Sequence, residues 1–162
     1  MRTLLRIFAL LLTVVPLRAQ TPADAPLSVR RLDGTEVVLS TAQLTALPRA
    51  TGRAVAHDKP FTFEGTDVRD VLRAAGVTPV DSLRGPQLRR VVVFAGADGY
   101  RAVIAQSDLD PSIGGRRAVL VDREDGAALP PARGPRRIIV EGDARPSRWV
   151  QQLVRLEVVD VP

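Results

Sequence analysis

The residue types best suited to catalysis are scarce in this chain. His57 is the only histidine, and there is no cysteine. An imidazole titrates near neutral pH, so His57 is the one ordinary candidate for acid–base chemistry. A Ser-His-Asp triad would need it, but no G-x-S-x-G segment is present, which favours a hairpin histidine without a catalytic role. The lack of cysteine excludes disulfides, thiolate metal ligands and thiol nucleophiles, and one histidine with carboxylates disfavours structural zinc.

Arginines are the next candidates, because planar guanidinium groups beside a glycine-rich backbone suit a phosphate group. Glycine or proline pairs precede two groups of arginines: Arg116 and Arg117, and Arg133, Arg136 and Arg137. Lys59 is the only lysine among 23 basic residues, which indicates a general preference for arginine in this composition. Taken alone, these groups are therefore explained better by solvated loop arginines than by a phosphate site.

One acidic segment partly resembles a metal-binding loop, and the nucleotide-binding motifs are absent. Asp122, Glu124 and Asp125 precede Gly126 and partly match a calcium loop. Their spacing fails the D-x-[DN]-x-[DN]-G pattern and the distal glutamate is missing, so a solvated acidic turn is the preferred interpretation. The sequence has no P-loop, and no G-x-G-x-x-G segment stands between a predicted strand and a helix.

The single tryptophan has an unusual setting. Trp149 lies in GDARPSRWVQQLVRLEV, residues 142–158, where Arg145 and Arg148 precede it and the last predicted strand follows. Two interpretations remain open from these residues alone. Trp149 is either a packing anchor for the terminal strand or one wall of a site for an anionic ligand.

Residues 1–20 have the layout of a secretory signal peptide. Arg2 and Arg6 precede an apolar run from 7 to 15, and the segment closes on a small residue at Ala19. The run is short for an uncleaved anchor, so we expect cleavage after Ala19 or Gln20, and a periplasmic or secreted protein. Removing three arginines lowers the formal charge from +5 to about +2, which gives no argument for nucleic-acid binding.

The elements that must position these side chains are mostly short strands. Apolar and β-branched runs predict strands at 27–32, 35–40, 52–58, 61–64, 91–94, 100–105, 118–121, 137–141 and 154–161. Asp33-Gly34 predicts a two-residue hairpin turn, and Asp98-Gly99-Tyr100 predicts a second hairpin corner. Residues 122–135 read as a long polar loop.

Three short helical segments are expected between the strands. Ser40 and Gln43 form a capping box that opens a helix ended by Pro48. Residues 67–75 place apolar side chains at helical spacing, and Gly76 is positioned to end that helix. Ser107 is expected to cap a helical turn at 108–113. Hairpins predominate over βαβ units, so the class is α+β, strand-rich, with mixed or antiparallel sheets and two or three short helices.

The order of these segments resembles the oxidoreductase molybdopterin-binding domain, the fold of the sulfite oxidase family, and especially its small, stand-alone, exported members. The resemblance is carried by FEGTDVRDVLRAAGV (63–77), VVVFAGADGYRAVIAQSDLD (91–110), LVDREDGAALPPARGPRRIIVEGDARPSRWV (120–150) and the final VRLEV. It covers about residues 44–158, and residues 21–162 are accordingly expected to form a single molybdopterin-binding-like domain.

The chain lacks the residues with which that family holds its metal. Catalytic relatives hold molybdenum through a pterin dithiolene and one protein cysteine in the strand before the segment matched by 63–77. The stretch here is RAVAHDKP, with His57 near the position of the cysteine, and the family's Asn-Arg pair is absent because the chain has no asparagine. The sulfite oxidase active site cannot therefore be built as the family builds it. No metal ligand is predicted among these residues.

The resemblance still implies a cofactor groove. Arg148 and Trp149 match the family's basic-Trp pair near the pterin, and His57, Arg116, Arg117 and Arg145 are further candidates for ligand contact. Three functions are weighed: binding of a pterin-like or other small anionic ligand, or of a partner protein, without oxidase chemistry; a molybdopterin-dependent oxidoreductase with a non-cysteine metal environment; and an interaction module whose groove has closed. No nucleic acid and, after signal cleavage, no membrane is expected among its partners.

Overall fold

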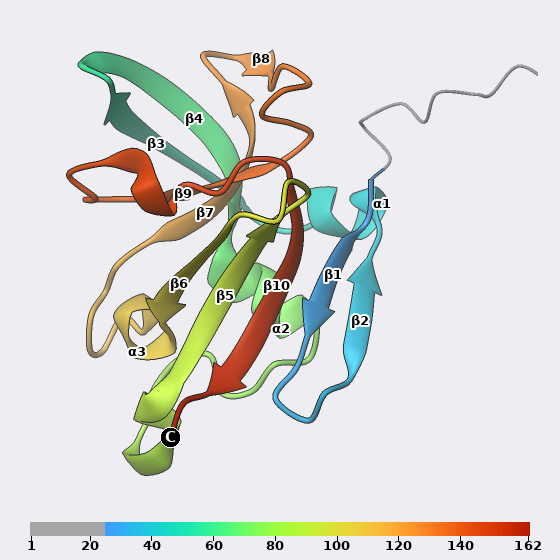
Figure 1. Ribbon diagram of the computed structural model, residues 1–162, viewed down its shortest axis with the longest axis vertical. Helices are drawn as coiled ribbons and strands as arrows, with labels where there is room; N and C mark the ends of the chain where they lie inside the picture. Colours follow the sequence, from blue (N-terminus) through green and yellow to red (C-terminus); the bar gives the residue numbers. More distant parts are fainter. Residues whose placement is uncertain (1–24) are drawn as a thin grey trace, which may run out of the picture.

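The computed structural model describes residues 25–162, so the expected signal peptide lies outside the described residues. The described chain forms two mixed or antiparallel sheets with short helices beside them (Figure 1). The first sheet has the order β2-β1-β10-β5-β6, and the second has the order β3-β4-β7-β8 with β9 also paired to β7. The first sheet comprises β1 Leu27–Arg30, β2 Glu36–Leu39, β5 Arg90–Gly96, β6 Arg101–Ala105 and β10 Leu153–Asp160. The second comprises β3 Arg49–Ala56, β4 Lys59–Asp67, β7 Ala118–Glu124, β8 Ala127–Ala128 and β9 Arg137–Val140.

The first sheet joins the two ends of the domain. Strand β10 lies between β1 and β5, parallel to β1 and antiparallel to β5. All other pairings in both sheets are antiparallel. The predicted α+β class with mixed sheets is therefore confirmed, and the single parallel pair depends on strands from opposite ends of the chain.

The hairpin turn at Asp33-Gly34 is longer than the two-residue turn predicted from the sequence. The β1–β2 hairpin is present, but its loop has three residues, because Gly34 N–H bonds to Arg31 O (3.0 Å) and Arg31 N–H bonds to Thr35 O (2.8 Å). Gly34 has φ +82°, which makes it the left-handed residue that completes such a loop. The predicted corner at Asp98-Gly99 closes in the same way, with Gly99 at φ +83°.

The polar segment after β7 contains structure that the sequence interpretation missed. Residues 122–135 were expected to be a loop, but β7 continues to Glu124 and turns through Asp125-Gly126 into β8. Strand β4 is likewise longer than the predicted strand at 61–64, since it runs from Lys59 through Gly65 and Thr66 to Asp67. Cross-strand pairing extends each strand beyond the short apolar run that indicated it.

Two of the expected helices are built as predicted. Helix α1, Thr41–Thr45, has Ser40 as its N-cap with the complete capping box to Gln43. Helix α2, Val68–Ala74, ends at Gly76 (φ +78°), where Val77 N–H bonds to Leu72 O at 2.9 Å. Asp67 caps its start by accepting from Arg69 N–H at 2.9 Å.

The third helical prediction was wrong in its start. Helix α3 spans Gln106–Leu109 and its N-cap is Ala105, with no side-chain hydrogen bond, so Ser107 lies inside the helix. Strand β6 runs directly into this helix, which leaves no room for a capping turn before Ser107. Two 3-10 helices complete the fold, η2 Gly85–Arg89 and η3 Pro146–Arg148.

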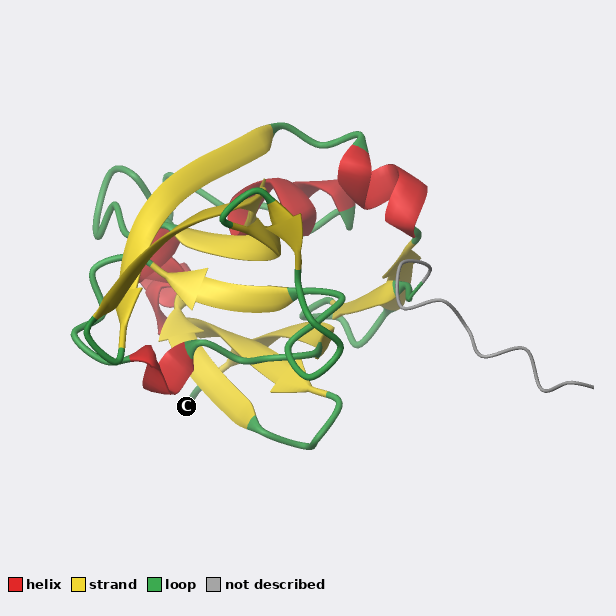
Figure 2. Ribbon diagram, turned by 90° about the horizontal axis from the view of Figure 1, so that it is seen from above, coloured by secondary structure: helices red, strands yellow, loops and turns green. Residues whose placement is uncertain are grey.

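One hydrophobic cluster includes side chains of both sheets and of α2. All four residues of the predicted strand at 118–121 are buried, as are all four residues of β9. Figure 2 shows strands throughout the molecule, with the short helices between and beside them. Within residues 25–162, none of the helices has the length and apolar character that crossing a membrane requires.

Candidate functional site

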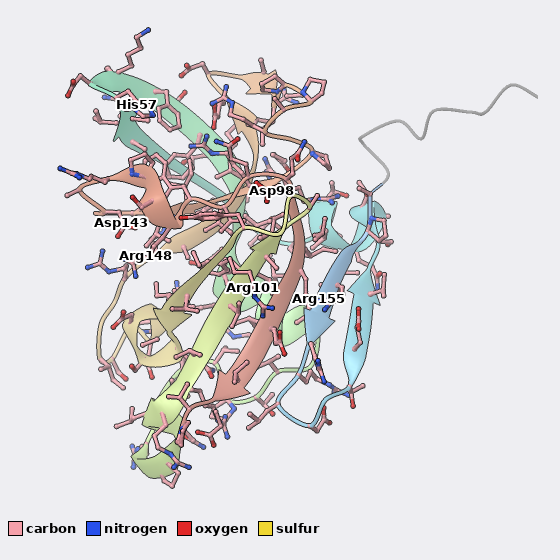
Figure 3. All side chains as sticks on the ribbon, viewed as in Figure 1. His57, Asp98, Arg101, Asp143, Arg148 and Arg155 are labelled. Atoms are coloured by element: carbon pink, nitrogen blue, oxygen red, sulfur yellow. The ribbon has the colours of Figure 1, made fainter. Side chains whose placement is uncertain are left out.

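A cavity of about 940 Å³ lies between the β3–β4 hairpin and the segment from Glu141 to Trp149. It brings together three of the predicted site residues, His57, Arg145 and Trp149. The other lining residues are Arg53, Ala54, Val55, Asp58, Glu141, Gly142, Asp143, Ala144, Pro146 and Ser147. In Figure 3 the labelled His57 lies on the hairpin, and Asp143 and Arg148 lie on the segment that follows β9.

Trp149 is a packing anchor as well as part of this cavity's wall. Only 7% of it is exposed, and its Nε1 donates to Val140 O at 3.1 Å. The ring meets Phe61 edge to face, with 6.1 Å between ring centres and 74° between the planes. The guanidinium of Arg137 lies 5.5 Å from the ring centre. These contacts hold the indole in a fixed position at the base of the cavity.

Asp143 binds the guanidinium groups of Arg148 and Arg116. Arg148 Nε donates to Asp143 Oδ2 at 3.0 Å, and its Nη2 makes a second bond to Oδ1. Arg116 Nη1 lies 3.2 Å from Asp143 Oδ1. The hydrogen bonds to Asp143 raise the pKa of Arg148. Arg148 itself does not line the cavity, but the carboxylate that it binds does.

Arg117 is engaged in the same way. Its Nη1 lies 3.0 Å from Glu141 Oε1, and its Nη2 lies 3.5 Å from Thr51 O. Three of the four predicted arginines, Arg116, Arg117 and Arg148, are thus paired with Asp143 or Glu141. This pairing fixes the segment after β9 against the rest of the second sheet.

Two cavity arginines have side chains without an ion pair or hydrogen bond within residues 25–162. One is Arg145, which was predicted, and the other is Arg53 on β3, which was not. Both side chains are exposed, so their guanidinium donors face solvent at the cavity. The alternation of residues along β3 places Arg53 on one face of the strand. Only the tertiary structure shows that this face borders the predicted site.

The whole neighbourhood carries excess positive charge. Five arginines line or adjoin the cavity, against three carboxylates. The arginines are Arg53, Arg116, Arg117, Arg145 and Arg148, and the acids are Asp58, Glu141 and Asp143. Because Arg53 and Arg145 are the unpaired cations, the cavity is suited to a small anion.

His57 lies at the tip of the β3–β4 hairpin rather than in the interior. With Asp58 it forms a two-residue turn in which both have positive φ, 50° and 62°. The imidazole is exposed and lines the rim of the cavity. An exposed position at a hairpin tip suits ligand contact better than metal binding, which needs further ligands and fixed neighbours.

A molybdenum cofactor fits this cavity only in part. The chain has no thiolate, and residues 25–162 contain no cluster of three or more His, Cys, Asp or Glu able to hold a metal ion. The unpaired arginines suit the anionic part of a pterin, and the immobilised indole offers a flat apolar surface. The residues present therefore do not reproduce a metal site, while they do match the charge of an anionic ligand.

The two sheets and their connections define a sulfite oxidase-like fold, like that of a molybdopterin oxidoreductase domain, and the resemblance drawn from the sequence is confirmed at the level of the fold. The chain is similar in structure to the sulfane dehydrogenase SoxCD from Paracoccus pantotrophus, with a TM-score of 0.68 and 18% sequence identity. The similarity covers 88% of this chain and 40% of that chain. No protein-family model matches the sequence, and no curated protein matches it.

Proposed function

We propose that this chain is an exported, single-domain binding protein that holds a pterin-like or other small anionic ligand in the cavity between the β3–β4 hairpin and residues 141–149. The observation that carries the proposal is the pair of unpaired arginines, Arg53 and Arg145, beside a cavity of about 940 Å³. Sulfite oxidase-type catalysis is not part of the proposal, because the chain has no cysteine to hold molybdenum.

Each side chain has a separate task in this proposal. Arg53 and Arg145 donate to the anionic group from two sides of the cavity, since one lies on β3 and the other just before η3. Arg116 and Arg148 position Asp143, and Arg117 positions Glu141, so that the cavity wall keeps its shape. Trp149 supplies a rigid apolar surface for a ring, and His57 adds a donor at the rim.

The binding proposal is tested by titrating the protein with pterin-6-carboxylate and, separately, with inorganic phosphate. Two charge-assisted contacts contribute about 1.5–3 kcal/mol each, so Arg53→Gln with Arg145→Gln should weaken binding at least about tenfold. Arg89→Gln serves as the matched control, because Arg89 lies in η2 beside Asp160 and outside the cavity. Equal affinity of the double variant and the wild-type protein would refute the assignment.

A closed-groove interaction module remains the second candidate, and the burial of Trp149 favours it. The two candidates differ in the tryptophan signal. A ligand resting on the indole changes the fluorescence of Trp149, the chain's single tryptophan, whereas a module that binds a partner elsewhere leaves this fluorescence unchanged during both titrations. A flat fluorescence response together with no measurable heat would favour the interaction module.

The remaining alternative, a molybdopterin-dependent oxidoreductase without a cysteine ligand, is tested on protein isolated from its native compartment. Elemental analysis for molybdenum and fluorescence of extracted pterin decide it, and N-terminal sequencing of the same sample tests cleavage after Ala19 or Gln20. Stoichiometric molybdenum would support the oxidoreductase, whereas pterin without molybdenum would support the binding protein. Isolation after export matters, because a cofactor loaded before export would be missed in cytoplasmic material.

A further inference from the structure

A second cavity, of about 710 Å³, lies on a different part of the molecule and shares no lining residue with the first. It is bounded by α1, the facing strands β4, β7 and β8, and the connection that leads into β9. Its wall combines apolar side chains with a few charged ones. The lining residues most important here are Leu44, Leu120, Leu129, Arg49, Asp122 and Arg136.

Arg136 is the unusual member of this wall. Only 5% of the residue is exposed. Its Nη1 donates to Ala25 O at 2.5 Å and its Nη2 donates to Thr41 Oγ1 at 2.9 Å. Arg136 makes no ion pair within residues 25–162. Burial lowers its pKa, and the charge of Asp122, which is bound to Arg49, opposes this only in part. The partners of Arg136 are neutral oxygen atoms, so among the described residues no counter-charge is in contact with it.

The other charges of this cavity are balanced among themselves. Arg49 makes two bonds of 2.7 Å to the two carboxylate oxygens of Asp122, and Glu64 lies 3.9 Å from the same guanidinium. Arg123 donates to Gly126 O at 2.6 Å and is exposed. With three arginines and two carboxylates in the wall, one positive charge is in excess, and the buried one is that of Arg136.

A buried cation without a counter-ion is unfavourable, because its desolvation is not offset by an ionic partner. A ligand that carried one negative charge to Arg136 would supply the missing partner. The leucines on α1, β7 and the loop after β8 would remove the rest of such a ligand from water. The cavity therefore offers one cationic group for an anion and an apolar surface beside it.

We propose that this second cavity binds a small organic monoanion, with its carboxylate beside Arg136 and its aliphatic body against Leu44, Leu120 and Leu129. The proposal is independent of the function proposed for the first cavity. The two differ in ligand chemistry, since the first suits a polar anion between solvent-exposed arginines and the second suits an amphiphile. A ligand for one cavity is not expected to compete for the other.

Octanoate is the probe, followed by isothermal titration calorimetry and by the midpoint of thermal unfolding. Octan-1-ol tests the apolar body without the charge, and sulfate tests the charge without the body. We expect octanoate to bind the wild-type protein and to raise the unfolding midpoint. Both comparison compounds should bind at least about tenfold more weakly, since octan-1-ol has no charge to pair with Arg136 and sulfate has no apolar body to bury.

Arg136→Met tests the residue directly. We expect it to weaken octanoate binding at least tenfold, while its unfolding midpoint without ligand stays equal to or above that of the wild-type protein, because a hydrophobic side chain replaces an uncompensated charge. Arg155→Met is the matched control, since Arg155 lies on β10 with 44% of its side chain exposed and does not line the cavity. It should leave octanoate binding unchanged.

Ala128→Trp provides a second variant in case Arg136→Met does not fold. Ala128 is exposed on β8 and lines the cavity, so a large side chain there fills the space while Arg136 is retained. Octanoate should bind this variant at least tenfold more weakly. The proposal is overturned if octanoate does not bind the wild-type protein, if it binds Arg136→Met or Ala128→Trp with wild-type affinity, or if sulfate binds as tightly as octanoate.

Discussion

At the residue scale, the buried Arg137 connects two aromatic rings and a carboxylate next to the first cavity. The Arg137 guanidinium lies 5.5 Å from the ring centres of both Phe61 and Trp149. Glu124 Oε1 lies 3.0 Å from Arg137 Nε, and Arg133 lies 2.6 Å from the other oxygen of the same carboxylate. Arg137 and Glu124 have 5% and 10% of their side chains exposed, so this pair is buried and the position of Trp149 depends on it.

Glu124→Gln should therefore destabilise the protein strongly. Removing one partner of a buried ion pair costs about 3–5 kcal/mol, because it leaves the other charge uncompensated. Urea unfolding followed by the fluorescence of Trp149 measures this loss. Asp160→Asn is the control, since its ion pair with Arg89 is exposed and should contribute less than about 1 kcal/mol. Similar losses in the two variants would contradict the role of Glu124.

A second residue-scale prediction concerns acid stability. Asp110 accepts hydrogen bonds from Leu83 N–H (2.7 Å) and from Ser112 N–H and Oγ (2.8 and 2.7 Å). The bond from Leu83 and those from Ser112 hold the pKa of Asp110 below its ordinary value. A lowered pKa in the folded state stabilises the protein above the pKa of the unfolded chain, and this contribution is lost as the pH falls through the folded-state pKa.

The measurement is the free energy of unfolding between about pH 7 and pH 2, a range that contains the ordinary carboxyl pKa. The wild-type protein should lose the contribution of Asp110 below about pH 4, and Asp110→Asn should be less stable at pH 7 and show a shallower decline. Curves that stay parallel across the whole range would show that Asp110 does not titrate with unfolding.

At the element scale, hairpins and helix ends place the candidate site. The β3–β4 hairpin carries His57 to an exposed tip and Arg53 onto the cavity wall, while Arg145, the residue before η3, lines the cavity from the segment that follows β9. Helix α2 packs on β4 and β7, the strands that also border the second cavity. How α2 ends therefore affects the second sheet and the wall of the second cavity.

Gly76 ends α2 in the left-handed region, at φ +78°. Gly76→Ala should lower the free energy of unfolding by about 1–2 kcal/mol, since a β-carbon is disfavoured in this conformation. Gly76→Asn is the matched variant and should lose less, because asparagine tolerates left-handed backbone better than alanine does. Urea titration of the three proteins measures the order. A larger loss in the asparagine variant would show that crowding near Arg31, rather than backbone strain, limits this position.

At the scale of the whole molecule, the last strand completes the first sheet. Strand β10 pairs with both β1 and β5, so it joins the β1–β2 hairpin to the β5–β6 hairpin. It also contributes Leu153, Leu156 and Val158 to the hydrophobic cluster. The sheet cannot be assembled from the preceding residues alone.

Deletion of residues 153–162 should abolish cooperative folding, because it divides the first sheet and exposes its core face. Deletion of Val161 and Pro162 alone is the control and should be tolerated, since both residues follow the strand and are exposed. Far-ultraviolet circular dichroism and amide proton dispersion distinguish the outcomes. A cooperative unfolding transition in the longer deletion would contradict the central role of β10.

The sequence by itself determined the fold class, the positions of most of the strands along the chain and two helix ends. Strand propensity, the Ser40 capping box and the terminating glycine at 76 act over a few neighbouring residues, so a short window contains the information. The segment order likewise identified the fold that the structure confirms. What it misjudged, the three-residue loop at Gly34, the start of α3 and strand β8, depends on pairing partners outside that window.

Only the tertiary structure decided which charges are available for a ligand. Arg117 and Glu141 are 24 residues apart, and Arg136 and Ala25 are 111 residues apart. No local pattern distinguishes Arg148, which is bound to Asp143, from Arg145, which has no such partner in residues 25–162. Coulomb interactions and desolvation depend on distance and burial in the folded chain, so identical side chains acquire different roles only when the sheets bring their partners together.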